Sequence, residues 1–262
     1  MCTVTFIARK RGYCLGMNRD EKLTRSIGLP PKMKTVNGRT VLCPSEPGGG
    51  TWIALNDCGA CLALINWYSV AQPLRKVLTV TLKKASKGWV DSNPVSRGEV
   101  VSGVRGAASP RQAAAMLQGL PLNLINPFRL IGIFPATREI AEWRWDLQKL
   151  DQKNHRWETR QWISSGFDEP VAQRERGRTF RQALQQRSAG RLRWLRQLHR
   201  SHSPQAGPFS TCMHRADAAT VSYTEISVSP RRAVMGYHPG ALCHRATWTV
   251  RRLRRGGDRA CY

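Results

Sequence analysis

The second residue of the chain carries the most specific chemistry in the sequence. Removal of Met1 would leave Cys2 with a thiol and a free α-amino group on one residue. A free α-amine titrates near ~7.7–8.0 and a thiol near ~8.5, so the amine can accept the thiol proton close to neutral pH. Nucleophilic catalysis with an N-terminal amine as the base is a recognised arrangement. Cys2 is therefore a candidate nucleophile, and a small apolar residue of an edge strand is the alternative.

Two predicted strands position this residue. Residues 3–7 are β-branched or aromatic in alternation with smaller polar residues, which is typical of a strand. A second strand is predicted over residues 12–17. A turn at Arg9-Lys10-Arg11-Gly12 would join the two strands as an antiparallel hairpin. The residues that follow the second strand would then lie beside Cys2.

Those residues form the polar cluster Asn18-Arg19-Asp20-Glu21. Arg19 could stabilise a thiolate or bind an anionic substrate group, because a nearby positive charge favours the ionised form. Asp20 could hold the protonated amine. An ordinary surface ion pair is the alternative for the two residues.

The opening Met1-Cys2-Thr3-Val4 and the polar cluster resemble the NRDE family, relatives of transport and Golgi organisation protein 2. The resemblance covers almost the whole chain and implies a single NRDE-type domain over residues 1–262. Further blocks in family order are Gly49-Gly50-Thr51-Trp52-Ile53-Ala54, Ser96-Arg97-Gly98-Glu99, Asn126-Pro127-Phe128, Ser164-Ser165-Gly166, and Cys212-Met213-His214-Arg215 with Asp217 and Thr220-Val221-Ser222.

This family is grouped with the N-terminal nucleophile hydrolases and is similar at its start to bile-salt hydrolases and penicillin acylases. The resemblance implies an α+β fold, a four-layer αββα sandwich. It also implies that Cys2 attacks an amide carbonyl, and that Arg19 and Asp20 correspond to an active-site Arg and Asp. Those enzymes space the pair apart, whereas this chain has the two residues adjacent.

The resemblance implies further polar candidates for oxyanion or substrate binding. Residues 55–67 are similar to a strand-turn-strand of the hydrolases whose last Asn donates to the oxyanion, which corresponds to Asn66. A fixed donor of this kind typically lowers the barrier by ~3 kcal/mol. Ser164 and Ser165 fall where the hydrolases place another Asn, and Asn18 is a candidate within the polar cluster. Turn or helix-cap roles are the alternatives for Asn66 and the two serines.

Beyond the opening hairpin, the 262 residues are enough for one sizeable core. Ser109-Pro110 predicts a capped helix that extends to Leu120. A longer helical pattern runs over residues 170–199, and Gly190 divides it. An order of strands, then helices, then strands fits the sandwich. Strands are predicted from the N-terminus to about Thr81, and again over 219–228 and 231–237 around Ser229-Pro230.

The chain is strongly basic, with 42 Lys and Arg against 17 Asp and Glu and a net charge of +25. Such a charge attracts polyanions. Basic residues concentrate at 174–200 and 251–255, with Trp194 and Trp248 nearby, and this combination can bind phosphates and stack on bases. The sequence contains no nucleic-acid fold motif, and arginine richness also arises from genome composition. Nucleic acid is therefore not the expected partner.

The sequence contains no apolar stretch long enough to span a bilayer, so no transmembrane segment is expected. Residues 9–11 interrupt the N-terminal apolar run, so no signal peptide is expected and the cytoplasm is the predicted location.

One pair of cysteines has the spacing of a redox or zinc motif. A zinc site would need two ligands in addition to Cys58 and Cys61, such as His199 with His202 or Cys212 with His214. The family resemblance places Cys58 and Cys61 in a strand-turn-strand, which implies structural roles. No metal and no cofactor are expected.

Three functions from different classes remain. The first is an N-terminal cysteine hydrolase or acyltransferase that acts on the C–N bond of a small-molecule amide or acyl substrate. The second is a non-catalytic protein on the same fold that binds or transports haem or lipid, because a fold does not prove chemistry. The third is a basic polyanion-binding protein. The first is favoured because Cys2, Arg19, Asp20 and Asn66 are the residue types that its chemistry requires.

Overall fold

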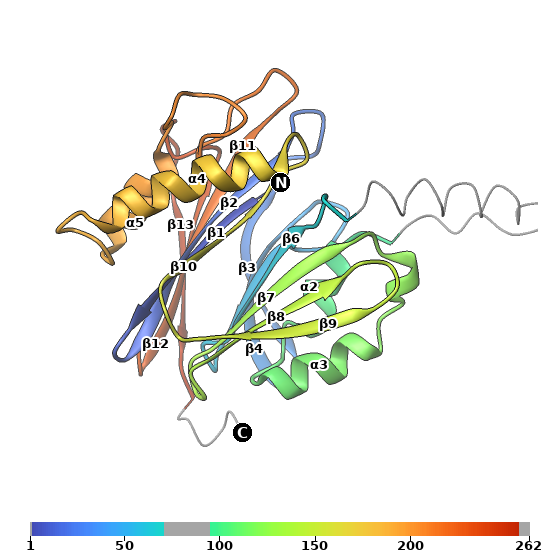
Figure 1. Ribbon diagram of the computed structural model, residues 1–262. Coiled ribbons are helices and arrows are strands. Elements are labelled where there is room, and N and C mark those ends of the chain that lie inside the picture. Colours follow the sequence, from blue (N-terminus) through green and yellow to red (C-terminus); the bar gives the residue numbers. More distant parts are fainter. Residues whose placement is uncertain (1, 71–94, 257–262) are drawn as a thin grey trace, which may run out of the picture.

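The computed structural model describes residues 2–70 and 95–256, which include two antiparallel sheets (Figure 1). Sheet A has six strands in the order β10-β1-β2-β11-β12-β13, and sheet B has seven in the order β3-β4-β5-β6-β7-β8-β9. The strands of sheet A are β1 (Cys2–Arg9), β2 (Gly12–Lys22), β10 (Arg160–Ser164), β11 (Ala218–Val228), β12 (Arg232–Pro239) and β13 (Thr249–Arg254). Those of sheet B are β3 (Leu29–Val36), β4 (Arg39–Ser45), β5 (Ile53–Asn56), β6 (Cys61–Asn66), β7 (Phe128–Phe134), β8 (Glu139–Trp145) and β9 (Leu150–His155).

Helices cover the outer face of each sheet (Figure 1). Helices α2 (Gly98–Val104) and α3 (Pro110–Gln118) pack on sheet B, and the short 3-10 helix η1 (Leu122–Leu124) follows them. Helices α4 (Glu169–Leu184) and α5 (Leu192–Arg200) pack on sheet A through a separate apolar cluster. The described residues thus form four layers in the order helices, sheet, sheet, helices.

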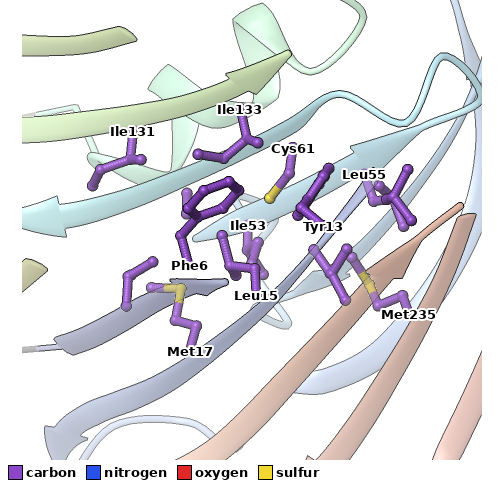
Figure 2. Packing of buried hydrophobic residues seen from close by; sticks show 14 of the residues in the cluster. Phe6, Tyr13, Leu15, Met17, Ile53, Leu55, Cys61, Ile131, Ile133 and Met235 are labelled. Carbon is purple, nitrogen blue, oxygen red and sulfur yellow. The ribbon is translucent and has the colours of Figure 1, made fainter. Parts of the chain in front are cut away.

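The main hydrophobic core lies between the two sheets, where Phe6, Leu15 and Met17 of sheet A meet Ile53 and Ile131 of sheet B (Figure 2). Complete burial of each such side chain stabilises the fold by roughly 1.5–3 kcal/mol. Side chains alternate between the two faces of a strand, so a shift of one residue would turn this whole set away from the facing sheet. The core therefore fixes which residues of β1 and β2 face sheet B.

The predicted N-terminal hairpin is confirmed, and Cys2 of β1 is paired with Arg19 of β2. The turn requires glycine at position 12, where φ is +106° and an added Cβ would lie 2.0 Å from the carbonyl oxygen of Val228. The polar cluster, predicted at the end of the second strand, belongs to β2, which continues to Lys22. Strand pairing therefore holds Arg19 and Asp20 rigidly.

Other predicted elements are confirmed in part. Ser109 caps α3, the long helical pattern divides into α4 and α5, and β11 and β12 form the predicted hairpin. The predicted order is wrong, because the four strands β7 to β10 lie between the two pairs of helices. Helix α2 was not predicted. The predicted strand region extends beyond β6 to Thr81, which lies outside the described residues.

The outermost strands carry polar or basic residues. Strand β13 at one edge of sheet A exposes Arg251, Arg252 and Arg254. Strand β3 at one edge of sheet B contains two prolines and exposes Lys32 and Lys34. In the described part of the chain, no helix is long and apolar enough to cross a membrane.

Candidate active site

Cys2 begins β1 and lies between two neighbouring strands, opposite Arg19 of β2 and Ser164 of β10. Its side chain is 7% exposed and faces sheet B as part of the core between the sheets. A cavity of ≈ 320 Å³ opens beside it, and Arg19 and Asn66 line the same cavity. The fold therefore brings together three predicted catalytic residues from β1, β2 and β6.

The Arg19 side chain is fixed against the wall of this cavity. Its Nη2 donates to Oε1 of Glu46 at 2.5 Å, and its Cζ lies 4.4 Å from the centroid of the Trp52 ring. Arg25 also binds Glu46, at 2.9 Å. Because Glu46 offsets part of the Arg19 charge, a substrate anion would have to compete with Glu46 for this guanidinium. Neither Glu46 nor Trp52 was identified as a site residue from the sequence, although Trp52 lies in the block Gly49-Gly50-Thr51-Trp52-Ile53-Ala54 and Glu46 lies shortly before it.

Asp20 also borders the cavity, but its carboxylate lies on the helical side of sheet A. Arg176 of α4 donates to Oδ2 at 3.1 Å, and Thr220 of β11 donates to Oδ1 at 2.7 Å. Burial raises the pKa of Asp20 above its ordinary value of 3.8, and the charge of Arg176 offsets part of that effect. That Asp20 holds the amine of Cys2 therefore stays a prediction, whereas its contacts with α4 and β11 are structural.

Arg176 was not predicted as a site residue, although its position in the helical pattern indicated a buried charge. It lies on the buried stripe of α4, four residues from both Ala172 and Phe180. A charged residue at such a position requires a buried partner, because an isolated charge in an apolar environment is costly. The partner is Asp20, and both side chains are fully buried.

Asn66 is the last residue of β6, as the strand-turn-strand pattern predicted. Its Nδ2 donates to the hydroxyl of Tyr68 at 2.7 Å, which fixes the orientation of the amide. The amide nitrogen carries two hydrogens, so one donation to Tyr68 leaves a second N–H to act as a donor. Its role as an oxyanion donor stays a prediction that this position supports.

The Asn18 amide makes contacts within the fold, and its role as a substrate or oxyanion group stays a prediction. Its Nδ2 donates to the carbonyl oxygens of Thr211 at 2.7 Å and His199 at 3.0 Å. The alternation along β2 directs this side chain towards α5, away from the cavity. The amide ties β2 to the segment that follows α5.

The two candidate serines differ in position. Ser164 is fully buried and is the strand partner of Cys2, and its Oγ has no hydrogen-bond partner among the described residues. Directly opposite residues of an antiparallel pair have Cβ atoms about 4.5–5.5 Å apart on the same face, so this hydroxyl lies beside the thiol. The Oγ of Ser165 accepts the backbone N–H of Phe167 at 3.3 Å, which supports a turn role.

The environment of Cys2 does not by itself activate the thiol. Burial raises the pKa of the Cys2 thiol above its ordinary value of 9.0, and a backbone hydrogen bond from Asp20 and the charge of Arg19 offset only part of this effect. The thiolate is the reactive form, so the side chain needs a base at neutral pH.

The structure does not support the alternative zinc sets built on Cys58 and Cys61. Cys61 lies in the core between the sheets, and the sulfur of Cys58 accepts from Arg39 at 2.7 Å. His199 is fully buried, and its ring nitrogens contact Asn18 Oδ1 at 3.1 Å and Thr5 Oγ1 at 2.9 Å. Burial lowers the pKa of His199 to about 3, so its ring is neutral.

A larger cavity of ≈ 550 Å³ lies between β7, β8, β10 and α4. Arginines from all four elements line it, among them Arg129 and Arg144, which both bind the buried Glu142. None of the predicted catalytic residues lines this cavity. The smaller cavity beside Cys2 is therefore the candidate active site.

Two facing antiparallel sheets between helical layers are the sandwich fold that the family resemblance implied. Two solved structures share the fold. A C2A mutant of the conjugated bile acid hydrolase from Clostridium perfringens aligns with a TM-score of 0.55 at 10% identity, over 96% of this chain and 92% of that one. The penicillin V acylase from Agrobacterium tumefaciens aligns with a TM-score of 0.53 at 11% identity, over 95% and 85%. No protein-family model and no curated protein sequence matches the chain.

Proposed function

We propose that the chain is a cytoplasmic, single-domain protein of the NRDE family that hydrolyses or transfers the acyl group of a small-molecule amide. The observation that carries the proposal is that Cys2, Arg19 and Asn66, from three different strands, line one cavity. The two proteins described above that share the fold are named as a conjugated bile acid hydrolase and a penicillin V acylase. Both names support cleavage of an amide.

In the proposed reaction, removal of Met1 exposes the α-amine of Cys2, which takes the thiol proton. The sulfur attacks the amide carbon, and the carbonyl oxygen becomes an oxyanion that the Nδ2 of Asn66 stabilises. As the tetrahedral intermediate collapses, the C–N bond breaks and the ammonium of Cys2 returns the proton to the leaving amine. Water or a second amine then attacks the thioester and releases the acyl group.

The geometry also supports a small substrate. The cavity volume of ≈ 320 Å³ is at the lower end of the usual range for small-molecule sites, about 300–1,000 Å³. Trp52 and Leu64 supply apolar contacts, while Arg19 and Arg25 supply charge at the same wall. A compact acyl group beside a polar amide fits this lining.

Intact mass and selective labelling test the proposal directly. We expect the native protein to lack Met1, and a limiting thiol-directed acylating reagent to modify Cys2 first. Of the six free cysteines in the described residues, Cys243 is the only one that is not buried, so labelling by exposure alone would favour Cys243. Preference for buried Cys2 would therefore measure activation and not access.

The matched controls are Cys2→Ser, which keeps a hydroxyl and the amine, and Cys43→Ser, which removes a buried thiol that does not line the cavity. Labelling should disappear in the first variant and persist in the second. Retention of Met1, or labelling led by Cys243, would remove the amine base from the mechanism. Those results would favour the haem- or lipid-binding function on the same fold.

A further inference from the structure

Four side chains that could bind a metal converge near one end of sheet A, outside the candidate active site. Their ligand atoms, the Nε2 atoms of His202 and His214 and the sulfurs of Cys212 and Cys243, lie within 4.8 Å of one another. The two nitrogens are 3.2 Å apart and the two sulfurs are 3.6 Å apart. The nitrogen of His214 lies 3.5 Å from Cys212 Sγ and 3.4 Å from Cys243 Sγ.

These separations are close to those of a tetrahedral zinc site. With Zn–S near 2.3 Å and Zn–N near 2.0–2.1 Å, tetrahedral angles place two sulfurs about 3.8 Å apart, a sulfur and a nitrogen about 3.6 Å, and two nitrogens about 3.3 Å. Four of the six separations are within roughly 0.2 Å of these ideal values. The other two, between His202 Nε2 and the two sulfurs, are at most 4.8 Å. A tetrahedral S₂N₂ ligand set is typical of zinc among the common metals.

Backbone contacts hold the ligands in place. The N–H of Cys212 donates to the carbonyl oxygen of Ser201 at 2.9 Å, and the N–H of His214 donates to that of Gly207 at 3.2 Å. The hydroxyl of Ser210 donates to the carbonyl oxygen of Cys212 at 2.6 Å. The loop that carries two of the ligands is therefore ordered by its own hydrogen bonds and presents both side chains to the same point.

We propose that His202, Cys212, His214 and Cys243 bind one structural Zn²⁺ ion. Four protein ligands complete a tetrahedron and leave no open position, which distinguishes a structural site from a catalytic one. The ligands come from two connections: His202, Cys212 and His214 lie between α5 and β11, and Cys243 lies between β12 and β13. The ion would tie these two connections together.

The site is linked to the candidate active site through one residue. Met213 lies between two of the ligands, and its backbone N–H donates to Thr220 Oγ1 at 2.9 Å. The same hydroxyl donates to Asp20, which borders the Cys2 cavity. Metal loss should therefore loosen Asp20 as well as the loop.

Metal analysis of the full-length protein tests the proposal. The protein is produced in zinc-supplemented medium, purified without chelator and analysed by inductively coupled plasma mass spectrometry. We expect about one zinc ion per chain. Cys212→Ser and Cys243→Ser should each weaken zinc binding by more than the about 10–100-fold that loss of an outer-shell partner costs. His244→Ala is the matched control, because that ring lies 5.9 Å from the His214 ring and is not one of the four ligands.

A second measurement uses only the wild-type chain, since the cysteine variants could fail to fold. The protein is stripped with a chelator and titrated with Co²⁺, which should give the intense visible bands of a tetrahedral ion and a thiolate charge-transfer band, both lost on addition of Zn²⁺. If the purified wild-type protein contains no zinc and shows none of these bands with Co²⁺, the proposal is wrong. A Cys212–Cys243 disulfide in the native protein, or equal zinc loss in His244→Ala, would overturn it too.

Discussion

Arg19 and Asp20 are neighbours in the chain, but their side chains have different surroundings. Arg19 lies in the cavity beside Cys2, where Trp52 and Glu46 hold it, and the Asp20 carboxylate is held by Arg176 beneath α4. The alternation of side chains along β2 causes this division. One residue can thus contact a substrate while the next one fixes the strand on which both depend.

The buried pair at this point leads to a prediction about stability. Arg176→Gln should destabilise the protein by about 3–5 kcal/mol, because Asp20 would stay buried without its guanidinium partner. Urea unfolding followed by far-UV circular dichroism measures the change. Arg178→Gln is the control, since Arg178 is 58% exposed and pairs only with Glu175 among the ion pairs of the described residues. Its effect should stay within about 0.5 kcal/mol, and equal effects of the two variants would contradict a structural role for the buried pair.

At the scale of elements, two segments distant in sequence meet at the cavity wall. Gly98, the first residue of α2, packs against Gly50, in the turn before β5. The backbones approach closely because neither residue has a side chain. This contact explains why the sequence places a glycine in each of two blocks that line the same cavity.

Gly98→Ala should therefore destabilise the protein by about 1–3 kcal/mol, because an added Cβ would lie 2.9 Å from the Cα of Gly50 and 3.0 Å from the nitrogen of Thr51. Thermal unfolding provides the measurement. Gly48→Ala is the matched control in the neighbouring turn, where an added Cβ would meet nothing within 4 Å. If both variants unfold at the wild-type temperature, the contact does not constrain α2.

The elements that could be predicted from the sequence are those set by local patterns. The N-terminal hairpin and the Ser109 cap depend on residues a few positions apart, and both are confirmed. Strand β9 has little apolar content, so no periodic pattern indicated it or its place in the sheet. Two contacts could not be predicted in this way, namely the pairing of Asp20 with Arg176 and the convergence of His202 with Cys243. Each joins positions far apart in the sequence, which only the packing of whole elements brings together.

The stability of the whole molecule depends on pH because ionisable groups are buried in it. Burial acts to raise the pKa of Glu142, but Arg129, Arg144 and His155 outweigh it and lower that pKa from 4.5 to about 2. Because the pKa is lower in the folded state, the stability that Glu142 contributes is present above pH 4.5 and is lost as the pH falls towards 2. The fall in pKa is equivalent to roughly 3 kcal/mol.

Glu142→Gln should accordingly be less stable than the wild type at neutral pH by up to about 3 kcal/mol, and the two proteins should converge below pH 4.5. Urea unfolding across this range gives the comparison. His199, whose pKa falls from 6.5 to about 3 in the fold, destabilises both proteins alike as the pH drops below 6.5. Curves that stay parallel down to pH 2 would show that Glu142 is not the group responsible.

The net charge of +25 does not by itself indicate nucleic acid as a partner. Trp194, predicted as an aromatic group that could stack on bases, is 1% exposed and donates to the carbonyl oxygen of Ala183 in the interior. Several arginines are also engaged within the fold, such as Arg196 with Glu225 and Arg255 with the carbonyl oxygen of Cys58. Much of the basic character thus serves internal contacts.

The basic edge strands have a further consequence. An exposed strand edge offers unpaired backbone groups on which another copy of a protein can build a continuous sheet, the first step of fibril growth. Strand β13 places three exposed arginines along such an edge, and β3 places two prolines and two lysines along another. Two copies approaching edge to edge would bring like charges together. The arginine content thus helps to keep this β-rich chain from aggregating in a crowded cell.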